Sequence, residues 1–174
     1  MSTFPSWLPD VVPFSDFDCD LKKYLDHLHG IFEKDFLVSR PVYNGKPVFF
    51  DKNVIENYSA CFWHLITESK IADYQRVDVA NLSLLRCERI CWMRPVIENH
   101  KHQAVSVWEN TRGRKTNTLF LLEDYDYIVV LTNIKDKFYL VTAYYIAYPN
   151  RKRELIAERD RYLQSKNRLT SETV

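Results

Sequence analysis

One histidine and one basic loop are the residues of this chain most suited to chemistry. His64 lies in an apolar run, between Trp63 and Leu65. The ordinary pKa of an imidazole is about 6.5, so this side chain could exchange a proton at neutral pH. A core histidine held by one hydrogen bond would occupy the same run, and the sequence leaves both interpretations open.

The segment from Trp108 to Asn117 is the most informative polar stretch. It carries Arg112, Arg114 and Lys115 between an aromatic and an amide side chain. Guanidinium groups bind phosphate oxygens through paired hydrogen bonds, and a neighbouring aromatic ring can stack on a base. The segment therefore fits phosphate or nucleic-acid binding, although an ordinary basic hairpin loop has the same composition.

Two hydroxyl-bearing residues lie near the end of a strongly apolar strand. Strand alternation predicts Leu140, Thr142 and Tyr144 on one face. A hydroxyl and a phenol two residues apart could contact a substrate phosphate. Threonine and tyrosine are also favoured in strands for packing alone, so a purely structural role stays open.

The sequence gives little support for a metal or a cofactor. The two His-x-His pairs lack the spacing of a helical zinc motif, and no third ligand is marked nearby. The four cysteines form no Cys-x-x-Cys motif, and with three glycines the chain contains no glycine-rich nucleotide loop. We expect reduced thiols, no metal site and no cofactor; the residues considered as ligands are His27, His29, Glu98, His100 and His102.

The net charge of +1 conceals a segregated pattern. Residues 1–36 hold seven acidic and three basic side chains, residues 86–115 hold seven basic and three acidic ones, and residues 150–174 hold seven basic and four acidic ones. Two basic segments in a nearly neutral protein could bind a polyanion locally. Solvated helix faces and a basic tail would give the same pattern.

Length and composition indicate one globular domain spanning residues 1–174. The chain has 174 residues, of which 46% are apolar, enough to bury a core. The first residues do not combine a basic start with an apolar run, and no segment is apolar enough for a membrane span. We therefore expect a soluble, cytoplasmic protein.

The N-terminal third combines an irregular arm with a helix. Three prolines within residues 1–18 predict the arm. Residues 19–36 show apolar side chains at steps of three and four, which predicts an acidic amphipathic helix capped by Asp18 or Asp20.

Turn residues and apolar runs predict the next elements. Asn44-Gly45 between apolar runs predicts a β-hairpin, and Pro47 predicts that its second arm lies at a sheet edge. The run 61–67 has no decisive period, and we interpret it as a strand. Residues 78–100 are predicted to form a helix that Pro95 bends or divides.

The second half of the chain predicts a sheet followed by a helix. Short connections between the apolar runs require antiparallel neighbours, and strands apolar on both sides require helices over both faces. A last helix begins at Pro149, and residues 166–174 are predicted to be a flexible tail. The fold class is α+β, with N-terminal helices, a C-terminal helix and a twisted, mainly antiparallel sheet of about four strands at 104–109, 118–122, 127–131 and 137–146.

Taken in order, several motifs resemble a known family. They are Phe62-Trp-His-Leu-Ile66, Arg86-Cys-Glu-Arg-Ile-Cys-Trp-Met-Arg-Pro-Val-Ile97, Trp108-Glu-Asn-Thr-Arg-Gly-Arg114, Asp124-Tyr-Asp-Tyr-Ile-Val-Val-Leu131 and Val141-Thr-Ala-Tyr144. Over residues 40–165 they resemble a phage- or prophage-associated member of the Barnase–EndoU–colicin–RelE (BECR) superfamily of metal-independent RNases. The fold that this resemblance implies agrees with the elements predicted above.

The resemblance implies roles for particular residues. His64 would be a general acid or base, and Arg112 and Lys115 would hold the scissile phosphate. Thr142 and Tyr144 would line the same cleft, and the second proton-transfer group would be Tyr144, Lys115 or Glu109. Further contacts to RNA would come from Arg86, Arg94, Trp108, Arg114 and Asn117.

The leading hypothesis is a metal-independent RNase that forms a 2′,3′-cyclic phosphate, in the manner of a mobile-element toxin or effector. Its partners would be RNA, with tRNA and rRNA as candidates, and an inhibitory or immunity protein; no DNA or membrane partner is expected. It predicts that His64 and the Arg112–Lys115 loop line one cleft. The alternatives are a non-catalytic RNA- or protein-binding module on the same fold and an interaction protein whose acidic N-terminal helix faces a basic partner.

Overall fold

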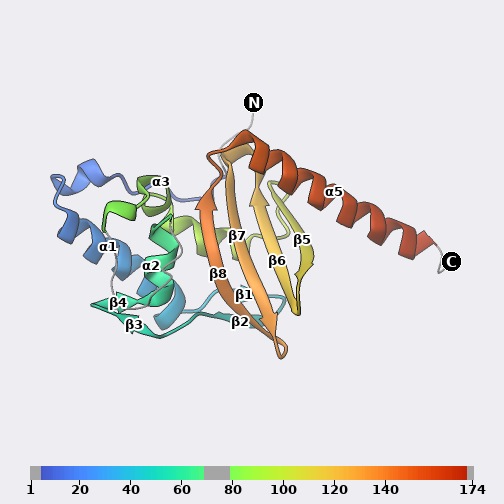
Figure 1. Cartoon of the computed structure of the whole chain (residues 1–174), viewed down its shortest axis with the longest axis horizontal. Helices are drawn as coiled ribbons and strands as arrows, with labels where there is room; N and C mark the ends of the chain where they lie inside the picture. Colours follow the sequence, from blue (N-terminus) through green and yellow to red (C-terminus); the bar gives the residue numbers. More distant parts are fainter. Residues whose placement is uncertain (1–4, 69–78, 172–174) are drawn as a thin grey trace.

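A computed structural model describes residues 5–68 and 79–171 of the chain. The helices of the N-terminal half lie beside a twisted sheet, and a long C-terminal helix crosses the opposite side of that sheet (Figure 1). The six strands follow the order β1-β2-β8-β7-β6-β5, and β3 and β4 form a separate small hairpin. None of the described helices is both long and apolar enough to span a bilayer.

The first helix forms where the sequence predicts it. Helix α1 spans Leu21–Glu33, a π-helical turn (η2) continues it over Lys34–Val38, and Asp20 Oδ1 accepts a hydrogen bond from the Lys23 amide at 3.1 Å. The carboxylate caps the helix by satisfying an amide that has no partner within it. Before α1 lies the short 3₁₀ helix η1, Phe14–Phe17.

The predicted hairpin at Asn44-Gly45 is confirmed. Strands β1, Val42–Tyr43, and β2, Lys46–Phe49, pair antiparallel, and both turn residues have positive φ. The edge position predicted from Pro47 is wrong, because β1 forms the edge and β2 also pairs with β8 in parallel. Pro47 is tolerated because the pairing with β8 involves Val48 and Phe49, one residue further on.

The run 61–67, predicted as a strand, is a helix. Strands β3, Val54–Ile55, and β4, Tyr58–Ser59, precede α2, which spans Ala60–Ile66. Ser59 Oγ caps the helix by accepting a hydrogen bond from the Phe62 amide at 3.1 Å. Six of the seven α2 residues are buried, so the run is apolar on almost every side and carries no period that separates helix from strand.

The single helix predicted over residues 78–100 is instead four short elements; Asp78 lies outside the described residues. They are η3 Val79–Asn81, α3 Leu84–Cys87, η4 Ile90–Trp92 and α4 Met93–Glu98. Helical geometry is interrupted at Arg89, with φ −105° and ψ 15°. At this break the Glu88 carbonyl accepts a hydrogen bond from the Val12 amide, and the Arg89 carbonyl accepts one from the Tyr127 hydroxyl in addition to a local one from the Trp92 amide.

The four strands predicted in the second half are confirmed as an antiparallel meander. They are β5 Val105–Arg112, β6 Lys115–Leu122, β7 Tyr127–Ile134 and β8 Lys137–Tyr145, with the 3₁₀ turn η5 Glu123–Tyr125 between β6 and β7. The whole sheet has six strands, not about four, and it is mixed because β2 and β8 run parallel.

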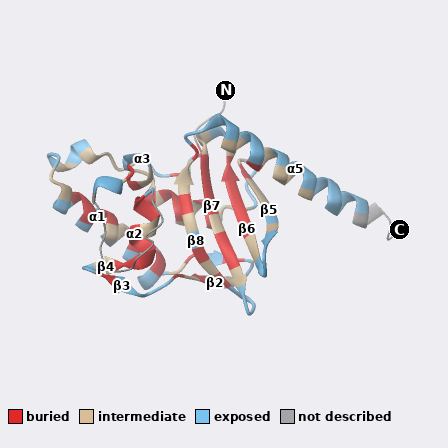
Figure 2. Ribbon diagram, in the orientation of Figure 1, coloured by how far each residue is buried: buried red, intermediate tan, exposed pale blue. Residues whose placement is uncertain are grey.

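Buried side chains fill both faces of the sheet (Figure 2). One core lies between the sheet and the N-terminal helices and contains Phe120, Val129 and Ala143. A smaller core lies between the other face and the C-terminal helix α5, and contains Trp108, Ile128 and Leu155. This arrangement confirms the expectation, drawn from strands apolar on both sides, that helices cover both faces.

Helix α5 spans Pro149–Ser171, so the tail predicted from residue 166 is helical through Ser171. Its first half is anchored on the sheet, and its C-terminal end projects past β5 (Figure 1). Glu158 Oε1 accepts hydrogen bonds from Trp108 Nε1 at 2.8 Å and from Asn110 Nδ2 at 2.7 Å. Lys152 Nζ lies 2.7 Å from an Asp126 carboxylate oxygen.

The anchoring of α5 can be tested by a cavity mutation. Leu155 is fully buried under α5, so Leu155→Ala is expected to lower the free energy of unfolding by about 2–5 kcal/mol. Leu163, 45% exposed on the same helix, is the matched control, and Leu163→Ala is expected to cost less than about 1 kcal/mol. Urea unfolding followed by circular dichroism measures both, and equal losses would contradict the docking of α5.

Candidate functional site

A surface cavity of about 240 Å³ opens where α3, the end of β8 and the start of α5 meet. Strand β2 pairs with β8 at Phe138 and Tyr139, and α2 and α3 pack against β8. The cavity is therefore a product of tertiary packing at the margin of the sheet. It is lined by Glu68, Ser83, Leu85, Arg86, Tyr144, Tyr145, Ile146, Ala147, Tyr148 and Arg151.

Arg86 connects three elements at the wall of the cavity. It lies on α3 and donates hydrogen bonds from Nη1 to the backbone carbonyl of Thr67 at 2.8 Å and to that of His64 at 3.4 Å. Its guanidinium carbon lies 5.3 Å from the centre of the Tyr144 ring on β8, a cation–π contact. Burial lowers the pKa of Arg86. The ordinary pKa of an arginine lies so far above neutral pH that the guanidinium group still keeps its charge.

Tyr144 shares the cavity with two guanidinium groups. Arg86 is over its ring, and Arg151, at the start of α5, lines the same cavity close enough for Tyr144 to affect its pKa. Burial alone would lower the pKa of Arg151, but hydrogen bonds and charge from Tyr144 and Glu154 raise it overall. The Arg151–Glu154 contact is 3.1 Å, so one of the two cations is partly neutralised.

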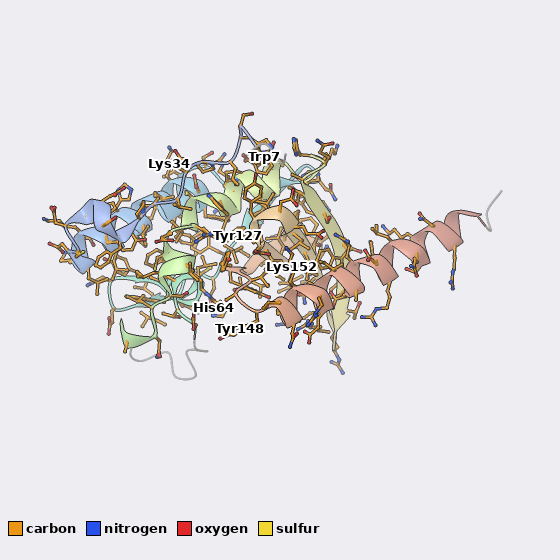
Figure 3. The ribbon with its side chains drawn as sticks, turned by 90° about the horizontal axis from the view of Figure 1, so that it is seen from above. Trp7, Lys34, His64, Tyr127, Tyr148 and Lys152 are labelled. Atoms are coloured by element: carbon orange, nitrogen blue, oxygen red, sulfur yellow. The ribbon has the colours of Figure 1, made fainter. Side chains whose placement is uncertain are left out.

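His64 lies beside this cavity and not within its lining. It is the single residue of α2 that is not buried, and its own carbonyl accepts the Arg86 hydrogen bond. Figure 3 shows His64 and Tyr148 on one side of the molecule, with Trp7 and Lys34 on the other. Burial lowers the pKa of His64, and the Arg86 charge lowers it further, so the imidazole is neutral at pH 7 and able to accept a proton.

Of the residues selected from the sequence, the structure places Arg86 and Tyr144 in the cavity lining, His64 beside it through the carbonyl that Arg86 binds, and Thr142 two residues before Tyr144 on β8. Thr142 pairs with Val130 and Tyr144 with Ile128, so both side chains lie on the α5 face of the sheet. Leu140, predicted on that face, packs into the opposite core, because a bulge opposite Val130/Leu131 shifts the alternation by one residue.

The basic loop does not belong to the cavity. Arg112 and Lys115 flank the β5–β6 turn, about 20 Å along the strands and three strands across from Tyr144. The predicted cleft shared by His64 and this loop is therefore wrong, and Arg112 and Lys115, predicted to hold the scissile phosphate, lie apart from His64. The sequence could not show this, because it does not reveal which strand neighbours α2.

Three further predictions for site residues need correction. Trp108 is 1% exposed and bonded to Glu158, so its ring cannot stack on a base. Asn117 donates to Asn110 Oδ1 at 3.3 Å under the same helix. Arg94 donates to the carbonyl of Ser39 at 2.6 Å and fastens α4 to the segment after α1.

Of the three candidates for the second proton-transfer group, Tyr144 lines the cavity. Glu109 and Lys115 lie on β5 and β6, away from it. Sequence reasoning missed Arg151 and Tyr148, which reach the cavity because α5 starts directly after β8. The run of basic residues that starts at Arg151 was visible in the sequence. The sequence did not show that this run lies next to Tyr144.

No group of three or more metal-binding side chains converges within residues 5–68 and 79–171. His102 Nδ1 instead accepts a hydrogen bond from the Ala104 amide at 3.1 Å, and His100 Nδ1 lies 2.9 Å from the Ile97 carbonyl.

No family model, curated protein or solved structure matches the chain.

The neutral state of His64 predicts how stability depends on pH. Because the folded state holds the His64 pKa below its unfolded value, the unfolded state binds more protons near pH 6.5. The free energy of unfolding is therefore expected to fall as pH drops from about 6.5 through the folded pKa. Burial also lowers the pKa of His29, so this histidine contributes in the same direction.

Urea denaturation between about pH 7.5 and 5 measures this slope. His64→Gln, which cannot be protonated, is expected to retain a shallower slope, due to His29 and the remaining groups. His29→Gln serves as the matched comparison, and it is expected to remove the part of the pH dependence that His29 contributes. A His64→Gln slope identical to that of the wild type would show that the imidazole is not held neutral.

Proposed function

We propose that the chain is a metal-independent endoribonuclease that cleaves RNA by attack of a 2′-hydroxyl on the adjacent phosphate. The observation that carries the proposal is the cavity that the Tyr144 phenol shares with the Arg86 and Arg151 guanidinium groups, with His64 at its edge, where Arg86 binds the His64 carbonyl. The resemblance to BECR RNases selects His64, Arg86 and Tyr144 as well, but it does not name Arg151. The proposal rests on the cavity residues and no longer on the Arg112–Lys115 loop.

The proposed reaction assigns a role to each group. His64 takes the proton of the 2′-hydroxyl, whose oxygen forms a bond to phosphorus. The Arg86 and Arg151 charges stabilise the phosphorane, and the bond from phosphorus to the 5′-oxygen breaks. Tyr144 gives its proton to that leaving oxygen, and the adjacent guanidinium charges stabilise the phenolate. The products are a 2′,3′-cyclic phosphate and a 5′-hydroxyl.

Thr142 is proposed to contact the substrate next to the reacting phosphate. It lies two residues before Tyr144 on the same face of β8 and is partly exposed. Its hydroxyl can donate to a phosphate oxygen. A toxin or effector of a mobile element, acting on tRNA or rRNA and restrained by an inhibitory protein, remains the biological setting that the resemblance suggests.

A non-catalytic RNA-binding module is the second proposal. The cavity lining combines Tyr144 with two guanidinium groups, Arg86 and Arg151, whereas His64 is outside that lining. Both observations suit a site that holds a phosphate without transferring protons. RNA bound at low salt and left intact would favour this alternative.

The nuclease proposal is tested by incubating the protein with bulk tRNA and rRNA in EDTA. The wild type is expected to leave 2′,3′-cyclic phosphate ends, and His64→Ala to cleave about 10²- to 10⁴-fold more slowly. His27→Ala, an exposed histidine on α1, is the control and is expected to cleave like the wild type. Equal cleavage by wild type and His64→Ala would remove His64 from the mechanism.

The role of the phenol is tested by Tyr144→Phe, which keeps the ring under Arg86 and removes the hydroxyl. We expect kcat to fall by about 10²-fold or more with little change in KM, because proton donation acts in the transition state. Tyr58→Phe, which removes a phenol bonded to Asp26 beside α1, is the matched control. A raised KM at unchanged kcat would assign Tyr144 to substrate binding alone.

A further inference from the structure

The end of the sheet opposite the cavity carries unpaired positive charge. The turns β5–β6 and β7–β8 lie at this end, and α5 starts at the other (Figure 1). Asp136, in the β7–β8 turn, is paired with Lys46 at 2.5 Å. Among the described residues, no ion pair joins a carboxylate to the exposed cations of these turns, Arg112, Arg114, Lys115, Lys135 and Lys137.

Strand register concentrates this charge on one face. Arg112 is directly opposite Lys115, and Lys137 is opposite Ile134 on the neighbouring pair of strands. Like charges directly opposite each other destabilise a sheet. By alternation, Arg112 shares the face of Trp108, which is also the face that carries Tyr144.

An aromatic pair adjoins one of these cations, Lys137. Phe49 on β2 and Tyr139 on β8 are partners in the parallel ladder, with ring centres 5.6 Å apart. The Arg40 guanidinium carbon lies 4.8 Å and the Lys137 ammonium 5.7 Å from the centre of the Phe49 ring. Both rings are partly exposed, whereas their neighbours Val48 and Phe138 point into the core.

Strand β8 connects this aromatic pair to the cavity. Tyr139 and Tyr144 are about 16 Å apart along the strand, and the partly exposed Thr142 lies between them on the same face. The bulge at Val141 leaves that side chain 38% exposed. A chain of nucleotides could therefore run along β8 from the cavity to the turns.

We infer that Phe49 and Tyr139, with Arg112, Lys115 and Lys137, form a platform for single-stranded RNA that flanks the cleaved phosphate. This inference rests on the proposed function and names the substrate as unpaired RNA several nucleotides long. Bases stack on the two rings, since every base has a π-face, and the cations contact the phosphates. Trp108, selected from the sequence for stacking, is replaced in this role by Phe49 and Tyr139.

Fluorescence anisotropy tests the platform with a labelled oligouridine of about 12 nucleotides, fully 2′-O-methylated so that it cannot be cleaved. Between about 50 and 200 mM KCl, the triple variant Arg112→Ala/Lys115→Ala/Lys137→Ala is expected to bind at least tenfold more weakly and to flatten the salt slope by about 2. The matched control, Lys22→Ala/Lys34→Ala/Lys101→Ala, removes three exposed cations elsewhere and is expected to bind like the wild type.

Stacking is tested separately from charge. Tyr139→Ala is expected to weaken binding about fivefold or more, whereas Tyr139→Phe, which keeps the ring, is expected to retain it. Thermal unfolding checks that each variant is folded. Equal weakening by both triple variants, or equal binding by Tyr139→Ala and wild type, would overturn the inference.

The binding assay requires no catalysis, so failure of the inference and failure of the nuclease proposal are distinguishable. If the wild type binds the probe, the platform variants do not, and no RNA is cleaved, the nuclease proposal is contradicted and the platform is supported. If the wild type cleaves RNA and the platform variants bind the probe as tightly as the wild type, the nuclease proposal is supported and the platform is contradicted. Equal competition by polyaspartate at matched charge would show a site for acidic polypeptides and overturn the assignment to RNA.

Discussion

The candidate site depends on the Arg86 guanidinium, which holds three parts of the molecule together. It binds the backbone carbonyl of Thr67 at the end of α2 and lies over the Tyr144 ring of β8. The last carbonyls of a helix lack partners within it, and a charged donor satisfies one of them strongly. The same cation lines the cavity, and it lowers the pKa of His64 further after burial has lowered it. One side chain therefore links the backbone of α2 to the Tyr144 ring and brings positive charge to the cavity.

Strand β8 is the element around which the two proposed activities are arranged. Its early residues pair with β2, and its later part is left for α2 and α3 to pack against. One margin of the strand therefore offers an aromatic pair at one end and a cavity at the other. Helix α5 covers the remaining strands through Leu155 and the Glu158 hydrogen bonds, which leave Trp108 inaccessible. On this face of the sheet, the part along β8 between the aromatic pair and the cavity stays accessible.

Local signals in the sequence were sufficient where the chain contacts itself nearby. Asn44-Gly45 identified its hairpin because few other residues accept positive φ at both turn positions. The meander followed from successive apolar runs joined by short connections. Such signals failed at residues 61–67, where an almost wholly buried helix resembles a buried strand, and at Arg89, where partners distant in sequence interrupt the helix.

The sequence by itself determined an α+β fold and a meander buried on both faces, and it selected His64, Arg86, Thr142 and Tyr144 as candidates. Only the tertiary structure decided which of the basic segments joins them. Arg151 does so because α5 begins directly after β8, whereas the Arg112–Lys115 turn is carried to the other end of the sheet. The order of strands in a sheet and the path of a terminal helix depend on packing between distant segments, and residue type and spacing do not encode these distances locally.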